Sequence, residues 1–266
     1  MNMIQMVGLV TLIYFVTLAL IVFNLRKINT RIGNAIFIIC DVVFYFFWMY
    51  GYFMSSGTFT VGMLIGQISP LTCVILPLTL IMSEKMRKYA YAAVAFLNFG
   101  LFAAMFISPE HAYLFSFYEQ ATVPYTGEAL CHMLCSLFGI YLVLTDQVEA
   151  SLESLGRACV FIYSIIGAGI GINYLFHQSL FGMDPYGNYS IYMIDIFGSF
   201  PATLAAYLVG VLLVLILGLQ SAHLLKAVCR RIYREEILAE GEDTANEACA
   251  SLEDGKNEKI AEEITE

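Results

Sequence analysis

Charged residues are scarce in this sequence, and positive charge is missing from several of its connecting segments. Only 13% of the 266 residues are Asp, Glu, Lys or Arg, whereas 59% are apolar and the mean hydropathy is +0.75. A soluble domain usually carries about 25% charged residues, so this composition excludes an ordinary soluble protein. The sequence is that of a membrane protein.

Several signatures of known chemistry are also absent. The sequence has no Walker A motif, no GxSxG, no HExxH and no paired-histidine spacing, so neither ATP hydrolysis nor zinc chemistry is expected. Its seven cysteines include no CxxC pair, and most lie in apolar stretches, where free cysteines behave as small hydrophobic residues. No basic face is available for nucleic acid. We therefore expect no metal, no cofactor and no nucleic-acid partner.

Seven apolar stretches are present, each close to the length of about 20 residues that crosses a bilayer. They lie at 3–24, 33–54, 61–82, 89–107, 127–146, 157–177 and 200–222. No positive residue precedes the first stretch, so we expect it to be a mature helix rather than a cleaved signal. The sequence therefore predicts an all-α, polytopic bundle of seven transmembrane helices.

The thirteen Lys and Arg residues fix the orientation of this bundle. They follow the first, third, fifth and seventh stretches, whereas the connections at roughly 55–60, 108–126 and 178–199 contain none. Cytoplasmic loops retain Lys and Arg, so the N-terminus is predicted outside and the C-terminus in the cytoplasm. All lysines are then cytoplasmic, which excludes a buried retinal Schiff base. We expect a multi-pass protein of the cell membrane, the plasma membrane of a bacterium.

The net charge of −9 comes from the end of the chain. From Glu235 onward there are twelve acidic residues and two lysines, a balance of −10, so the rest of the chain carries +1. A segment with few large apolar residues cannot offset the entropy lost on ordering. We therefore expect a membrane domain at 1–234 and a disordered or weakly helical cytoplasmic tail at 235–266. A docking role for the tail is the alternative.

Ionisable side chains inside a membrane are costly, so they are the first candidates for function. The fifth stretch carries Glu128 at its outer end and His132 one turn deeper, with Cys135 and Ser136 deeper still on the same face. His132 alone is explained equally well as a core histidine bonded to a neighbouring helix. In this company it is a candidate acid or base.

Two other stretches add polar groups at similar depth. Asn173 and His177 lie in the outer half of the sixth stretch, and His177 is also explained as an interfacial residue. Gln67 lies in the outer half of the third stretch, with Thr72 and Cys73 near the midplane. These groups predict a polar cavity in the outer half of the bundle.

Two features are interpreted as structural. Asp41 falls in the inner half of the second stretch, where we expect it to pair with Asn98 or a hydroxyl, or to stay protonated. Gly167 and Gly171 form a GxxxG pattern, which is typical of a face where another helix approaches closely.

Short motifs give the chain a resemblance to a known family. They are Pro70-Leu71-Thr72-Cys73, Phe106-Ile107-Ser108-Pro109, His132 at the outer end of its stretch, Ile172-Asn173-Tyr174, Asn188-Tyr189 and Gly198-Ser199-Phe200-Pro201. In these features the chain resembles the YwaF-like integral membrane proteins, whose animal relatives are membrane phospholipid acyltransferases that use a cysteine and a histidine. The family's histidine beside the third-span cysteine is absent, and Thr72 stands near its place.

Three functions remain open at this point. The resemblance implies a lipid acyltransferase in which Cys73, activated by His132, carries an acyl chain between membrane lipids. The same cavity equally suits a transporter or sensor that binds a small solute or lipid without catalysis. A scaffold acting through its acidic tail is the third. The expected substrate contacts are Gln67, Thr72, Glu128, Asn173 and His177.

Overall fold

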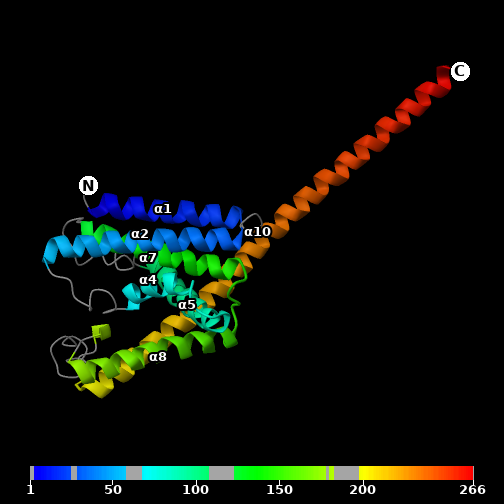
Figure 1. Ribbon diagram of the computed structural model, residues 1–266. Coiled ribbons are helices and arrows are strands. Elements are labelled where there is room, and N and C mark those ends of the chain that lie inside the picture. Colours follow the sequence, from blue (N-terminus) through cyan, green and yellow to red (C-terminus); the bar gives the residue numbers. More distant parts are fainter. Residues whose placement is uncertain are drawn as a thin grey trace. The chain divides into compact units, whose positions relative to one another are not determined.

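The computed structural model is all-helical over the residues it describes, which are 3–24, 29–57, 68–107, 123–177, 180–182 and 198–265. In chain order the helices are α1 (Met3–Phe23), α2 (Thr30–Ser56), α4 (Ile68–Leu78), α5 (Glu84–Ile107), α7 (Val123–Leu144), α8 (Leu152–Phe176), the short 3₁₀ helix η3 (Leu180–Gly182) and α10 (Phe200–Thr265) (Figure 1). Each apolar stretch of the sequence overlaps one of the α-helices. The all-α prediction is confirmed for this part of the chain.

Four of the described helices are long and apolar enough to cross a membrane. The segments are Thr30–Gly51, Thr126–Leu144, Leu152–Phe176 and Phe200–Tyr233, and α1 adds a shorter apolar stretch, Gly8–Phe23. Helix α4 is described over the 11 residues Ile68–Leu78, and the residues just before it lie outside the described part of the chain. The structure thus has the apolar helices of a membrane-embedded bundle. The seven crossings and the outward N-terminus stay predictions.

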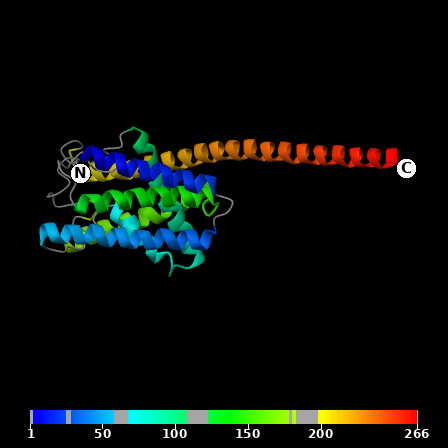
Figure 2. The same cartoon turned by 90° about the horizontal axis from the view of Figure 1, so that it is seen from above.

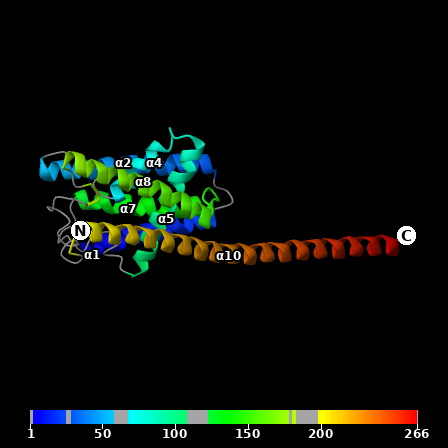
Figure 3. The same cartoon turned by 90° about the horizontal axis from the view of Figure 1, so that it is seen from below.

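Helix α7 is the central helix of the bundle. In its apolar segment 94% of the residues are buried, against 22% to 28% in the segments of α2, α8 and α10. It packs most extensively against α2 and α5 and also contacts α1 and α4. Figure 2 shows α7 between α1 and α2, and Figure 3 shows α4 beside α2. The outer helices keep large apolar side chains exposed, as surfaces facing lipid do.

Two glycines allow other helices to approach α7 closely. A Cβ atom at Gly127 would lie 2.6 Å from the Cα atom of Trp48 in α2. One at Gly139 would lie 3.0 Å from the carbonyl oxygen of Ala95 in α5. Such short distances leave no room for a side chain, so the contacts of α7 with α2 and α5 depend on these glycines.

The close contact of α8 involves a different glycine from the expected pair. A Cβ atom added at Gly167 or Gly171 would meet nothing within 4 Å in the described chain. A Cβ atom at Gly169 would instead lie 2.3 Å from the ring of Phe181. Gly169 therefore allows η3 to pack closely against α8.

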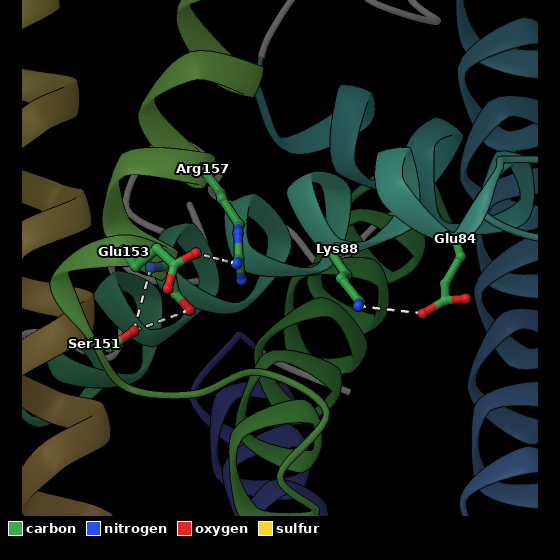
Figure 4. Close-up of polar contacts among 6 residues, drawn as sticks. Glu84, Lys88, Ser151, Glu153 and Arg157 are labelled. Carbon is green, nitrogen blue, oxygen red and sulfur yellow. Dashed lines mark hydrogen bonds and ion pairs between the residues drawn. The ribbon is translucent and has the colours of Figure 1, made fainter.

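Helices α5 and α8 begin with the same charge pattern. Lys88 pairs with Glu84 at 3.2 Å, and Arg157 pairs with Glu153, each one turn apart (Figure 4). The side chain of Ser151 accepts a hydrogen bond at the first turn of α8 and caps it. An acidic residue near a helix N-terminus is favourable, and the ion pair holds the following basic side chain.

A polar network joins three helix ends. The Asn34 amide of α2 donates to Gln147 at 2.7 Å and to the Tyr91 hydroxyl of α5 at 3.3 Å. The Tyr141 hydroxyl of α7 donates to the carbonyl of Thr30 at 3.2 Å. The starts of α2 and α5 and the end of α7 therefore meet at one end of the bundle. This is the end that the Lys and Arg pattern assigns to the cytoplasm.

Helix α10 is continuous from Phe200 to Thr265 and includes the acidic tail. By its contacts the chain divides into two compact units, Met1–His223 and Leu224–Glu266, so the division falls inside α10 and before the expected boundary at 234. The tail, expected as a disordered or weakly helical extension, has helical backbone in the structure.

Candidate functional site

The expected site residues of α4 and α7 meet at a pocket with α2. Six side chains line this pocket, and we call it the thiol pocket: Trp48 from α2, Thr72 and Cys73 from α4, and Cys131, His132 and Cys135 from α7. Residues four apart lie on one face of a helix, so α7 presents Cys131 and Cys135 together with His132 beside them. The pocket contains both predicted catalytic residues and one predicted substrate contact, Thr72.

Cys135 is the centre of the polar contacts in the thiol pocket. Its sulfur lies 3.7 Å from the sulfur of Cys73 and accepts a hydrogen bond from the Thr72 hydroxyl at 3.6 Å. The Cys135 thiol in turn donates to a carboxyl oxygen of Asp41 at 3.9 Å. All four residues are at most 2% exposed. Three helices thus bring two thiols, a hydroxyl and a carboxyl group into direct contact.

Asp41, which the sequence suggests is structural, lies beside the thiols. It is fully buried in α2, and its Oδ2 atom has no hydrogen-bond partner among the residues that the structure describes. The expected partner Asn98 donates instead to the carbonyl of Val94 in its own helix, at 2.7 Å. Asp41, Cys73 and Cys135 offer donor atoms that all lie within 4.8 Å of one another. Asp41 does not line the thiol pocket itself, but it contacts Cys135, which does.

His132 is held by its own helix. Its Nδ1 atom lies 2.8 Å from the carbonyl oxygen of Glu128. A carbonyl only accepts, so Nδ1 carries the proton and Nε2 keeps the free lone pair of the neutral ring. The Trp48 ring lies beside it, with the two ring centroids 6.3 Å apart. Hence His132 can offer Nε2 as a base or as a metal ligand.

The thiol pocket is narrow. Its six lining side chains leave no space in which a water molecule would fit. The single tryptophan of the sequence, Trp48, is 3% exposed and forms one wall. A ligand that enters must move side chains apart.

The other expected contacts lie elsewhere or outside the described residues. The Asn173 side chain donates to the carbonyl of Leu180 at 2.9 Å and accepts from its N–H at 2.8 Å, which fixes the turn after α8. His177 ends α8 in the left-handed conformation, with φ 52. The Glu128 side chain is buried but does not line the thiol pocket. Gln67 lies outside the described residues.

No protein-family model, curated protein or solved structure matches this chain. The resemblance to the YwaF-like proteins therefore stays an expectation from short motifs.

Proposed function

We propose that this chain is an integral membrane protein that binds a small polar or ionic ligand in the thiol pocket, as a transporter or a sensor. The observation that carries this proposal is the buried Asp41 carboxyl group. Within the described part of the chain one of its oxygens has no hydrogen-bond partner, and two thiols lie beside it. An ionisable group inside a membrane is costly and is retained where it acts. A ligand that bonds to this oxygen offsets the cost of burying it.

Binding without catalysis agrees best with the narrow pocket. Its six lining side chains leave no space in which a water molecule would fit, so a long acyl chain would have to displace several of them. The hydrogen-bond partner of Cys73 is Cys135, and that of His132 is the Glu128 carbonyl. Neither contact activates the Cys73 thiol.

Acyl transfer is the second candidate, because Cys73 and His132 line the same pocket and Nε2 of His132 is the basic atom. His132 would take the Cys73 proton, and the thiolate would attack a lipid ester carbonyl to form a thioester. The leaving alkoxide would recover the proton from His132. A second lipid would then accept the acyl group by the reverse steps.

One pair of measurements separates the two candidates. Thermal unfolding of the full-length protein in detergent is followed with ZnCl₂, CdCl₂, KCl, potassium phosphate, glycine and glutamate. A ligand present at 100 times its Kd should stabilise the protein by about 2.7 kcal/mol. Thr72→Val and His132→Ala should weaken this stabilisation, because both side chains line the pocket. Mass spectrometry after incubation with dioleoylphosphatidylcholine should show no acyl adduct on Cys73.

The opposite results decide against binding. If none of these compounds stabilises the unmodified protein, the proposal fails. If an acyl thioester is found on Cys73 and disappears in Cys73→Ala, acyl transfer replaces it. A stabilising effect that is unchanged in both pocket variants also overturns the proposal, because the compound then binds elsewhere.

A further inference from the structure

We infer that Asp41, Cys73 and Cys135 form a binding site for a soft divalent metal ion of the zinc class. The inference rests on the proposed function and names the ligand of the same pocket. It does not follow from any motif, because the three donors come from α2, α4 and α7 and are far apart in the sequence. Only the packing of these helices brings them together.

The distances between the donors fit one small ion. A tetrahedral ion with bonds of about 2.3 Å to sulfur and about 2.0 Å to oxygen separates two sulfurs by about 3.8 Å, and sulfur from oxygen by about 3.5 Å. The Cys73 and Cys135 sulfurs are 3.7 Å apart, and the Cys135 sulfur is 3.9 Å from the Asp41 oxygen. These two separations differ from the tetrahedral values by a few tenths of an ångström, and the third, between the Cys73 sulfur and the Asp41 carboxylate, is at most 4.8 Å.

The chemistry of the donors favours a soft or borderline ion. Thiolate ligands select Zn²⁺, Cd²⁺ or Cu⁺, whereas Mg²⁺ and Ca²⁺ require oxygen ligands. The thiols of Cys73 and Cys135 would release their protons to solvent on binding. Two thiolates and the Asp41 carboxylate then carry a charge of −3. A divalent ion reduces the net charge of the site to −1, whereas Cu⁺ leaves −2, and buried net charge is costly.

A fourth donor is available in the same pocket. Cys131 and His132 both line it together with Cys73 and Cys135. His132 adds no charge, and its Nδ1–H already bonds to the Glu128 carbonyl. Metal-bound histidines usually make such a hydrogen bond with the ring nitrogen that does not hold the metal. His132 is therefore the better fourth ligand.

The test measures Zn²⁺ and Cd²⁺ binding to the purified full-length protein in detergent. One ion should bind per chain by elemental mass spectrometry, and Cd²⁺ should give the ultraviolet absorption of a thiolate complex. Cys73→Ser and Cys135→Ser should each abolish that absorption, and Asp41→Asn should weaken binding at least about tenfold. Mg²⁺ at the same concentration should not compete.

Two matched variants control for general thiol binding. Cys40→Ser changes the residue beside Asp41 in α2, and Cys159→Ser changes a cysteine of α8. Both cysteines are outside the pocket lining, so both variants should bind as the unmodified protein does. If a pocket variant fails to fold, alkylation of the unmodified protein gives the same answer. Bound Zn²⁺ should protect Cys73 and Cys135, and leave Cys159 reactive.

The possible failures are distinct from one another. Absence of stoichiometric binding, or binding that survives in Cys73→Ser and Cys135→Ser, overturns the metal site. If potassium phosphate, glycine or another non-metal compound still stabilises the protein through Thr72 and His132, the proposed binding function stands. If neither the metal salts nor the non-metal compounds stabilise the protein through these residues, the metal site and the proposed binding function are both wrong.

Discussion

Single buried hydroxyl groups join helices of this bundle. Tyr14 of α1 is fully buried, and its hydroxyl lies 2.9 Å from that of Ser136 in α7. Ser136 also donates to the carbonyl of Asn98 in α5, at 3.3 Å. The pair therefore connects the first helix of the chain to the central one.

Replacing Tyr14 by Phe should lower the free energy of unfolding by about 1 kcal/mol, because a buried hydrogen bond is lost. Unfolding in mixed detergent micelles measures this change. In a double-mutant cycle with Ser136→Ala, the two substitutions should be coupled by about 0.5–1.5 kcal/mol. Tyr50→Phe on the exposed face of α2 is the control and should have little effect. If the effects of Tyr14→Phe and Ser136→Ala are additive, the two hydroxyl groups are not in contact.

Part of the candidate site can be predicted from the sequence. The sequence selects Cys73, His132 and Thr72, because polar groups in apolar stretches are conspicuous. It gives Asp41 the wrong partner, Asn98, although Asp41 and Cys135 lie at similar distances from the ends of α2 and α7 that are predicted to be cytoplasmic. It also treats Cys131 and Cys135 as hydrophobic packing residues. A thiol becomes a ligand only when other donors face it, and helix periodicity alone cannot show which helices are neighbours.

Helix α7 packs closely against its neighbouring helices. Its partners approach so closely that the glycines at the contacts leave no space for a methyl group. Helix α8, in contrast, carries glycines at Gly167 and Gly171 that no described atom approaches within 4 Å. The same substitution should therefore have opposite effects in the two helices.

Gly127→Ala should destabilise the protein by about 1–3 kcal/mol, because the new methyl group overlaps the backbone of Trp48. Gly167→Ala should be neutral or stabilising by up to about 1 kcal/mol, because alanine favours helix more than glycine does. Thermal unfolding of the two variants in the same detergent measures the difference. Equal effects would mean that α2 and α7 are not in this close contact.

The composition of the chain predicts its helical class but not the arrangement of its helices. Composition predicts the all-helical class and the positions of the helices, because a membrane span must be long and apolar. It does not predict that α7 is central, since apolarity marks burial and lipid contact alike. Nor does it predict that α4 ends at Leu78, directly after Pro77, which has no backbone N–H to donate.

The orientation of the bundle gives a prediction that uses its lysines. All of them should be cytoplasmic, so a membrane-impermeant amine reagent should modify none in intact cells. In opened membranes the reagent should modify Lys88, whose side chain is 59% exposed. Peptide mass spectrometry distinguishes these sites from the N-terminal amine.

A lysine introduced into the predicted outer loop, Asn188→Lys, provides the positive control. It should be modified in intact cells and in opened membranes alike. Modification of Lys85 or Lys88 in intact cells would show that the orientation is opposite to the predicted one. The predicted depth of every polar residue would then be reversed as well.

The central position of α7 has a consequence for how the protein is made. Its main partners α1, α2, α4 and α5 all precede it in the chain, so they leave the ribosome before it does. Until α7 arrives, Asp41 and Cys73 lack the helix that supplies Cys135. The site is therefore assembled late in synthesis, when an already inserted group of helices receives its central member.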